Sequence, residues 1–324
     1  MTTALNGKLA TVFGGSGFVG RHVVRALAQR GWRIRVAVRR PDLAGFLQPM
    51  GGVGQIQPVQ ANLRYRWSVD QAVDGADAVI NLVGVLAQSG KQTFDAVHAF
   101  GAGAVAEAAR GAGIANVVHL SAIGADAQSN SGYARSKAAG EAAVRETLKA
   151  AVIMRPSIVF GPEDDFFNRF AGMARMSPAL PLIGGGETKF QPVFVGDVAE
   201  AIARAVEGEA RAGATYELGG PQVKSFRECL ELMLEIIGRK RLLLPVPFAA
   251  ARMIGRVAQR LPGAPLTLDQ VRMLEHDNVV SSAAREAGLT LDGLGIQPDT
   301  MAAILPSYLW RFREHGQYDA HPIV

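Results

Sequence analysis

Residues 9–20 read LATVFGGSGFVG, an apolar run that leads directly into a glycine turn. The first five residues have the length and the apolar, β-branched composition of a buried strand. A helical pattern follows over residues 18–30, and Gly31 is its expected stop. A strand, a glycine turn and a helix in this order predict the first βα unit of a Rossmann-type domain.

Gly14, Gly17 and Gly20 stand three residues apart at this turn. In a dinucleotide site, one such glycine permits the tight turn, one lets the backbone approach a pyrophosphate, and one lets the helix pack close to the sheet. The start of the helix adds N–H groups and the positive end of the helix dipole. An ordinary tight turn is the alternative, but the strand before it and the helix after it favour a dinucleotide site. The residues expected to line it here are Gly14, Ser16, Gly17, Phe18, Val19 and Gly20.

Short apolar runs alternate with helical stretches through the first half of the chain. This alternation predicts a parallel sheet that is covered by helices on both faces. Right-handed crossovers then give the doubly wound order. The expected fold is therefore α/β, a Rossmann-type doubly wound parallel sheet with a smaller C-terminal substrate lobe. Further strands are expected at residues 34–38, 55–60, 78–83, 117–120 and 151–156, and helices at 94–111 and 133–149.

The pattern loosens after Gly161, where glycines and prolines separate short elements. We expect an NAD(P)-binding Rossmann domain over residues 1–161. A smaller substrate lobe with a C-terminal extension is expected over residues 162–324. The boundary between them stays open, because the segment 190–206 can return to the Rossmann core.

The composition is that of a folded protein, since 48% of the 324 residues are hydrophobic and only 19% are charged. The single cysteine, Cys229, excludes an internal disulfide and a cysteine-based metal site, and it favours a reducing compartment. The net charge is +5 and the pI is near 9.5, but the basic residues are scattered and the longest cluster is 239–241. Without a basic stripe or a nucleic-acid motif, no nucleic-acid partner is expected.

The sequence shows no secretory signal, no transit segment and no run of about 18 apolar residues. A cytoplasmic location is therefore expected. Peripheral attachment to the inner membrane is the alternative.

The end of the second strand decides which dinucleotide is preferred. An NAD-binding domain places Asp or Glu about 20 residues after the glycines, where the carboxylate binds the ribose 2′-OH. Arg39 stands 19 residues after Gly20 and is followed by Arg40, with no carboxylate at that place. A guanidinium can bind a 2′-phosphate through two hydrogen bonds and stack on adenine. The pair favours NADP(H) over NAD(H), although both arginines could instead be solvated loop charges.

Residues 133–137 read YARSK and place Tyr133 four residues before Lys137. On a helix, residues four apart share one face. Tyrosine ordinarily ionises near pH 10, so it needs a nearby positive charge to act as an acid or base near neutrality. The ammonium of Lys137 one turn away would favour the phenolate, which indicates an acid–base device.

The glycine turn, the YxxxK pair and the sequence RPSIVFGP at residues 155–162 together resemble the short-chain dehydrogenase/reductase superfamily, in its extended or atypical branch. The resemblance implies that Tyr133 is the catalytic acid–base. It implies that Lys137 binds the nicotinamide ribose and lowers the tyrosine pKa. A serine after the fifth strand, here Ser121, would polarise the substrate carbonyl. Ser129 and Ser131 are further candidates, and Ser121 could instead cap the strand end or touch the nicotinamide.

The resemblance also implies further cofactor contacts. Asn62, followed by Leu63, occupies a place where many members carry an Asp that touches adenine. His98 stands where the superfamily often has a structural asparagine, and a lone histidine of this kind is assigned no role. The remaining residues expected to contact the cofactor are Val83, Gly84, Pro156 and Ile158.

Two stretches, residues 160–170 and 190–199, are more particular. They resemble the nucleotide-binding accessory subunit of mitochondrial respiratory complex I and its bacterial relatives, over roughly residues 8–240. In that subunit a tightly held NADPH is structural, and related proteins are linked to ubiquinone biosynthesis. The resemblance supports NADP(H) and weakens the case for turnover.

Three charged features outside the glycine turn have ordinary explanations. Asp197 before an apolar stretch is expected to be a helix N-cap. The acidic run 163–165 is expected to be a solvated loop, and no metal site is predicted. The stretch 249–261 carries Arg252, Arg256 and Arg260 at intervals of four, so it is expected to pack on the substrate lobe or, alternatively, to dock on a membrane or partner.

Two functions remain open at this point. The first is an NADP(H)-dependent oxidoreductase that acts on a carbonyl or alcohol, with a small and hydrophobic substrate such as a quinone or isoprenoid. The second is a non-catalytic protein that holds NADPH and associates with a respiratory or other membrane complex.

Overall fold

The computed structural model describes residues 5–259 and 266–314 of the chain, which forms two units that interleave along the sequence. The first unit comprises residues 1–156, 195–218 and 280–297, and the second comprises 157–194, 219–279 and 298–324. Sequence analysis placed one boundary after residue 161 and left the return of 190–206 open. In the structure, α6 (Val195–Val206) is part of the first unit.

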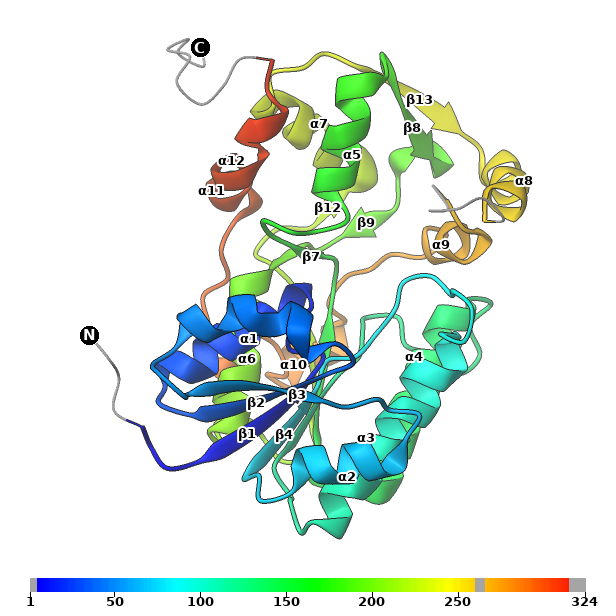
Figure 1. Ribbon diagram of the computed structural model, residues 1–324. Helices are drawn as coiled ribbons and strands as arrows, with labels where there is room; N and C mark the ends of the chain where they lie inside the picture. Colours follow the sequence, from blue (N-terminus) through cyan, green and yellow to red (C-terminus); the bar gives the residue numbers. More distant parts are fainter. Residues whose placement is uncertain (1–4, 260–265, 315–324) are drawn as a thin grey trace. The chain divides into compact units, whose positions relative to one another are not determined.

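The first unit is built on a seven-stranded sheet in which all neighbouring strands are parallel (Figure 1). The strand order is β11-β6-β5-β4-β1-β2-β3. This confirms the expected Rossmann-type α/β fold. The strands are β1 (Leu9–Phe13), β2 (Arg33–Val38), β3 (Ile56–Gln60), β4 (Ala78–Asn81), β5 (Val117–Leu120), β6 (Val152–Pro156) and β11 (Thr215–Leu218).

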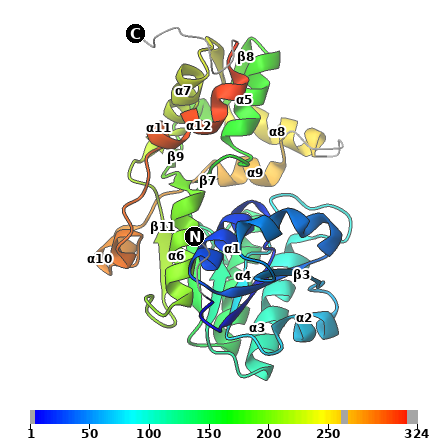
Figure 2. The same ribbon diagram turned by 60° about the vertical axis from the view of Figure 1, so that its left-hand side comes forward.

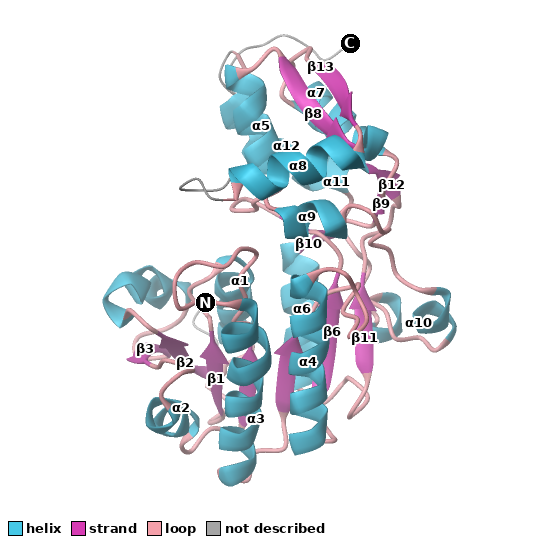
Figure 3. Cartoon of the chain, turned by 90° about the vertical axis from the view of Figure 1, so that its right-hand side faces the viewer, coloured by secondary structure: helices cyan, strands magenta, loops and turns pink. Residues whose placement is uncertain are grey.

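Helices cover both faces of this sheet (Figure 3). One face carries α1 (Phe18–Gln29) packed against α6, and the other carries α2 (Arg66–Val73), α3 (Gly101–Gly111) and α4 (Gly132–Thr147). Because both faces are covered, the central strands are apolar throughout, and side chains such as Val12, Val36 and Val118 have no exposed surface. The short elements η1 (Pro41–Met50) and α10 (Ser282–Glu286) complete the unit with the π-helical turn described below.

The seventh strand, β11, was assigned by its position in the sequence to the substrate lobe. In the structure it pairs in parallel with β6, from Thr215 beside Ile153 to Leu218 beside Pro156. A four-residue run carries too little pattern to reveal which sheet it joins. Which sheet the run joins depends on its pairing partner, β6, and that strand lies some 60 residues earlier in the chain.

The glycine turn brings the start of α1 against the end of β1. Gly14 has a φ of +78°, in the left-handed region that favours glycine. A Cβ on Gly20 would overlap the carbonyl oxygen of Gly14 and lie 2.6 Å from the Cα of Gly15. Gly15, which sequence analysis did not single out, is also required, because a Cβ there would lie 2.8 Å from Cγ1 of Val36.

The second unit is smaller and holds three two-stranded sheets with helices around a separate apolar core (Figure 2). The paired strands are β7 (Val159–Phe160) with β10 (Val193–Phe194), β8 (Ala179–Ile183) with β13 (Leu242–Val246), and β9 (Lys189–Phe190) with β12 (Lys224–Ser225). The helices are α5 (Phe167–Met176), α7 (Phe226–Ile236), α8 (Phe248–Ala258), α9 (Leu268–Met273), α11 (Met301–Ile304) and α12 (Pro306–Leu309), with the short turns η3 (Gly184–Gly186) and η5 (Trp310–Phe312).

The acidic run at 163–165 is not simply a solvated loop, as was expected. Asp164 is buried, and its carboxylate accepts hydrogen bonds from the hydroxyl of Tyr308 and from the backbone N–H of Gly161 and Asn168. Burial raises the pKa of Asp164, and these hydrogen bonds oppose the rise. The residue therefore closes a turn in the core of the second unit.

Two smaller expectations also change. Asp197 lies inside the first turn of α6 and not before the helix, because α6 begins two residues earlier, at Val195. The basic helix is α8, which ends at Ala258, so Arg260 and the expected helix end at 261 fall outside the described residues. Within the residues that the structure describes, no helix is long and apolar enough to cross a membrane.

We predict that Gly20→Ala lowers the free energy of unfolding by about 1–3 kcal/mol, because the added methyl group meets backbone atoms that cannot turn away. Urea unfolding of the purified protein measures this change. The matched control is Gly103→Ala in α3, whose Cβ would make an ordinary 3.5 Å contact with Ala143. That variant should be neutral or more stable by up to about 1 kcal/mol. Equal effects of the two substitutions would contradict the packing argument.

Candidate functional site

Most expected cofactor residues of the first unit follow the carboxyl ends of β1, β2, β3 and β4, which are consecutive neighbours in the sheet. Ligands of open α/β sheets bind at this edge. The loops after β1 and β4 are in contact, since a Cβ on Gly14 would lie 3.3 Å from the backbone nitrogen of Val83. Gly84 follows, and a Cβ there would lie 3.4 Å from Nζ of Lys137. The absence of side chains at these glycines therefore lets the loops after β1 and β4 and the Lys137 ammonium lie close together.

The glycine turn fits the pyrophosphate of a dinucleotide. Gly17 is the N-cap residue of α1 and has no side chain that could satisfy the first N–H groups of the helix. A helix start of this kind attracts an anion. Phe18 and Val19 begin α1, and Ser16 lies in the turn before it.

One of the two arginines, Arg40, already forms an ion pair within the chain. Arg40 and Asp42 form an ion pair of 2.7 Å at the surface, and both side chains are more than half exposed. The turn into η1 brings Asp42 back onto Arg40, so a carboxylate stands beside this arginine although none occupies its position. Arg39 is exposed and forms no ion pair within the described part of the chain.

Asn62 and Leu63 follow β3 and shape the next loop. The side-chain oxygen of Asn62 accepts from the N–H of Arg64, and its carbonyl oxygen accepts from Tyr65 and Ser68. Leu63 packs against Gly101 at the start of α3. Both residues therefore lie in an ordered turn beside the sheet edge.

Helix α4 carries the tyrosine and lysine. Ser131 is its N-cap and accepts a hydrogen bond from the N–H of Ala134, while Ser129 accepts from the N–H of Ser131. These two serines, considered above as catalytic candidates, thus have roles in starting the helix. The cap places Tyr133 in the first turn and Lys137 in the second, with Nζ of Lys137 5.9 Å from the centre of the Tyr133 ring.

Lys137 is buried, and its ammonium donates a 3.1 Å hydrogen bond to the carbonyl oxygen of Leu120, the last residue of β5. Burial lowers the pKa of Lys137 to about 8, against the attraction of Glu141 one turn further along α4. The carboxylate of Glu141 is itself buried and held by the guanidinium of Arg155 through two hydrogen bonds of 2.7 Å. The lysine charge therefore has its counter-charge on the same helix.

Ser121 comes directly after β5. Its N–H donates to the carbonyl oxygen of Met154, while its hydroxyl is buried and has no partner among the described residues. A buried hydroxyl without a partner costs free energy unless a ligand supplies one. The side chain therefore does not cap the strand end, and it offers a hydrogen bond to a bound molecule.

His98 was assigned no role from the sequence, yet the structure brings it to the tyrosine. It lies in the π-helical turn η2 (Asp95–Phe100), with its ring 5.3 Å from that of Tyr133 at a near-perpendicular angle. Gly140 of α4 permits this approach, because a Cβ there would overlap the carbonyl oxygen of His98. No signal in the sequence distinguishes His98 from other residues of the stretch 94–111.

The hydrogen bonds of His98 fix its tautomer. Nε2 accepts from the N–H of Val85, so Nδ1 carries the proton and donates to Oγ of Ser136. The Ser136 hydroxyl then donates to the carbonyl oxygen of Tyr133. Burial, with the nearby charge of Lys137, lowers the pKa of His98 to about 3. A neutral imidazole thus connects the loop after β4 to the turn of α4 that carries Tyr133.

His119 on β5 is a second buried histidine that the sequence did not reveal. Its Nδ1 accepts from the side-chain amide of Asn81 on β4 at 3.3 Å, which leaves the proton on Nε2. Burial and the charge of Lys137 lower its pKa to about 3 as well. Both histidines therefore remain neutral around the lysine.

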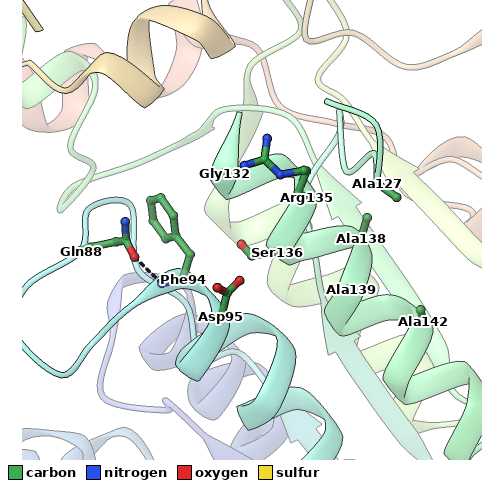
Figure 4. A pocket seen from close by; sticks show the side chains of 10 residues that line it. All are labelled: Gln88, Phe94, Asp95, Ala127, Gly132, Arg135, Ser136, Ala138, Ala139 and Ala142. Atoms are coloured by element: carbon green, nitrogen blue, oxygen red, sulfur yellow. Dashed lines mark hydrogen bonds between the residues drawn. The ribbon is translucent and has the colours of Figure 1, made fainter. Parts of the chain in front are cut away.

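A cavity of about 520 Å³ borders this group (Figure 4). Phe94 and Asp95 lie on one side of it, and the exposed side of α4 lies on the other. The cavity reaches the site at Ser136 and lies apart from the glycine turn. Its lining residues are Gln88, Phe94, Asp95, Ala127, Gly132, Arg135, Ser136, Ala138, Ala139 and Ala142.

Two expected cofactor contacts lie beyond these loops. Pro156 ends β6 in the first unit, and its carbonyl oxygen accepts from the N–H of Ile123. Ile158 belongs to the second unit and is packed against its core. Across residues 5–259 and 266–314, no group of three or more His, Cys, Asp or Glu side chains is arranged to hold a metal ion.

Comparisons with known proteins identify the family of the chain. The sequence profile of the NAD dependent epimerase/dehydratase family matches residues 10–219. A protein of Arabidopsis thaliana, NADH dehydrogenase (ubiquinone) 1 alpha subcomplex subunit 9, mitochondrial, is 36% identical over 326 residues, which cover 97% of this chain and 80% of that protein. The ceramide reductase of Caulobacter vibrioides is 39% identical over 183 residues, 56% of each chain. These similarities confirm the family resemblance that the motifs indicated.

A solved structure shares the fold. The NADPH-dependent quinone oxidoreductase of Escherichia coli, in complex with NADPH, superposes with a TM-score of 0.72. The superposition covers 93% of this chain and 99% of that one, at 21% sequence identity. At this identity the likeness concerns the fold alone.

We predict that the protein loses stability as the pH falls below 6.5, because His98 and His119 stay neutral in the folded state while their unfolded forms take up protons. Between pH 7.5 and pH 5, each histidine should lower the free energy of unfolding by about 2 kcal/mol. Urea unfolding at several pH values measures the slope.

The variant His98→Leu should remove about half of this pH dependence. The exposed His276 provides the control, since His276→Leu should follow the wild-type slope. Parallel curves for the wild type and His98→Leu would show that His98 is protonated in the folded protein.

Proposed function

The chain belongs to the NAD dependent epimerase/dehydratase family, the extended branch of the short-chain dehydrogenases/reductases, and on that premise we propose that it is an NADP(H)-dependent oxidoreductase of a carbonyl or alcohol substrate. Members of the family bind NAD(P). The observation that carries the proposal is the arrangement of Tyr133 beside the buried ammonium of Lys137, with the unpartnered hydroxyl of Ser121 at the end of β5.

The cofactor would be held by residues of the first unit. The turn at Gly14, Gly17 and Gly20 would receive the pyrophosphate at the start of α1. Arg39, which is exposed, would bind the 2′-phosphate of NADP(H), and Asn62 would meet the adenine. Since Arg40 already pairs with Asp42, its contribution would be the smaller of the two. The remaining expected contacts in this unit are Ser16, Phe18, Val19, Leu63, Val83, Gly84 and Pro156, whereas Ile158 belongs to the second unit.

The chemistry divides between the cofactor and the chain. A bound nicotinamide would supply the hydride for the substrate carbonyl carbon, or would accept one from the alcohol. In the direction of reduction, Tyr133 donates the proton of Oη to the carbonyl oxygen. Lys137 is mainly an ammonium at pH 7, which lies below its pKa of about 8, and it stabilises the negative charge left on the tyrosine. Ser121 donates a hydrogen bond to the substrate oxygen.

The proposed substrate is hydrophobic, of the lipid, quinone or isoprenoid kind. The similarity to a ceramide reductase supports this choice, since that name describes a lipid substrate. The acid–base pair of Tyr133 and Lys137 is suited to a carbonyl group in such a molecule.

A second candidate is a protein that holds NADPH without turnover, as a peripheral partner of a respiratory complex at an inner membrane. The observation that favours it is the 36% identity to a subunit of mitochondrial NADH dehydrogenase along 97% of the chain. The two candidates share the nucleotide site and differ in whether the nucleotide leaves.

We expect mass spectrometry of the purified protein to find NADP(H), and Arg39→Asp to weaken NADP(H) binding by at least about tenfold, because a charge-assisted pair to the 2′-phosphate is lost. NAD(H) binding should not fall. Arg110→Asp, at the exposed end of α3, is the control and should bind NADP(H) as the wild type does. Bound NAD(H) alone, or equal affinity of Arg39→Asp and Arg110→Asp for NADP(H), would overturn the assignment. Nucleotide that survives exhaustive dialysis would favour the second candidate over the first.

For turnover, we expect Tyr133→Phe to lower kcat by at least about a hundredfold while NADP(H) binding stays within twofold, because the phenolic proton is removed and the ring contacts with His98 remain. The assay follows NADPH absorbance with a panel of long-chain ketones and quinones. Tyr65→Phe, in an exposed loop, is the control and should keep full activity. Unchanged activity of Tyr133→Phe would remove the tyrosine from the mechanism, and a wild type that is inactive with every substrate would favour the NADPH-holding role.

A further inference from the structure

Large apolar side chains are exposed together on α8 and on β13 of the second unit. The exposed fractions are 69% for Met253, 51% for Ile254 and 66% for Val257 on α8, and 68% for Leu242 and 52% for Leu244 on β13. β13 leads through Pro247 directly into α8, and both lie on the same side of the second unit in Figure 1. We call these five residues the apolar face. Scattered exposed apolar residues are ordinary, whereas several large ones on two consecutive elements point to an interaction surface.

Helix α8 buries small residues along its length, whereas an ordinary surface helix buries its large apolar residues. Its small residues Ala251, Gly255 and Ala258 are buried, and a Cβ on Gly255 would lie 3.0 Å from the backbone of Leu268 at the start of α9. Phe248 at the start of the helix packs against the core, but Met253, Ile254 and Val257 point outward at positions i, i+1 and i+4. Because Phe248 and the small residues provide the packing inside the unit, the side with Met253, Ile254 and Val257 is left for something outside it.

Positive charge borders this apolar face. Residues 239–258 contain five basic residues and no acidic one. The charge of this segment is therefore as large as the net charge of +5 of the whole chain. Within α8, Arg252 and Arg256 lie along one edge of the exposed apolar side. Arg252 pairs with Glu275 of the neighbouring segment, whereas Arg256 is exposed. Before β13, Arg239 pairs with Glu314.

We propose that the apolar face docks the protein on an anionic phospholipid bilayer, with Met253, Ile254 and Val257 inserted at the boundary of headgroups and acyl chains. An interfacial helix has this composition, apolar on one side and basic at its edge, so that arginines reach the phosphates while their stems stay in the apolar layer. The inference goes beyond the proposed function and does not depend on the bound nucleotide.

Sedimentation with vesicles tests the docking. The full chain is mixed with vesicles of equimolar phosphatidylcholine and phosphatidylglycerol, with vesicles of phosphatidylcholine alone, and with buffer alone. We expect it to sediment with the mixed vesicles, to bind phosphatidylcholine much more weakly, and to stay in solution without lipid. A protein that stays in the supernatant with the mixed vesicles would overturn the proposal.

Two variants locate the contact. The triple variant Met253→Ser, Ile254→Ser, Val257→Ser should lower the partition coefficient by at least about tenfold, and Arg256→Gln should lower it about fivefold. The matched control is Leu5→Ser, Val53→Ser, Val223→Ser, which removes exposed apolar side chains elsewhere and should bind as the wild type does. All of these side chains are exposed, and thermal unfolding checks that each variant is folded.

Equal binding by the triple variant and its control would overturn the proposal. Analytical ultracentrifugation adds a separate outcome. A wild-type dimer that the triple variant converts to a monomer, together with an absence of vesicle binding, would assign the apolar face to a second copy of the chain and not to a membrane.

Discussion

The buried ammonium of Lys137 is the constraint around which the candidate site is organised. Its hydrogen bond to the carbonyl oxygen of Leu120 ties α4 to the end of β5, and this tie brings Tyr133 to the edge of the sheet where Ser121 begins the next loop. A buried cation is costly unless it has partners. Glu141, held in turn by Arg155, supplies the counter-charge from the next turn of the same helix.

The same charge determines the state of the groups around it. His98 and His119 are neutral because they are buried and because a second cation near Lys137 would be repelled. Neutrality fixes the tautomer of each, and the tautomer of His98 fixes the hydrogen bonds that run from Val85 through Ser136 to the backbone of Tyr133. Both ring nitrogens of His98 have partners within the chain, whereas Nε2 of His119 is buried without one among the described residues. The hydroxyl of Ser121 has none, which is the arrangement expected of a group that meets a ligand.

Local sequence patterns predicted much of the first unit. The alternation of strands and helices, the glycine turn and the YxxxK pair depend on neighbours in the chain, and they predicted the parallel sheet and the position of Tyr133 and Lys137. The patterns missed groups whose partners are distant. A side chain at Gly15 would collide with Val36. His98 is held by a hydrogen bond from the N–H of Val85 and by contacts with α4, which begins more than 30 residues later. Asp42 was overlooked beside Arg40 because a turn, and not a regular element, brings the two together.

The sequence by itself determined that the chain folds as a Rossmann-type domain with a nucleotide turn, since periodicity and glycine spacing are local properties of the backbone. Tertiary structure alone decided that β11 joins the sheet, that α6 returns to the first unit, and that Asp164 is buried against Tyr308. It also decided which side of α8 is covered. A helix pattern shows that apolar residues share a face, but only the packing of Gly255 against α9 shows that the small face is inside and the large one outside.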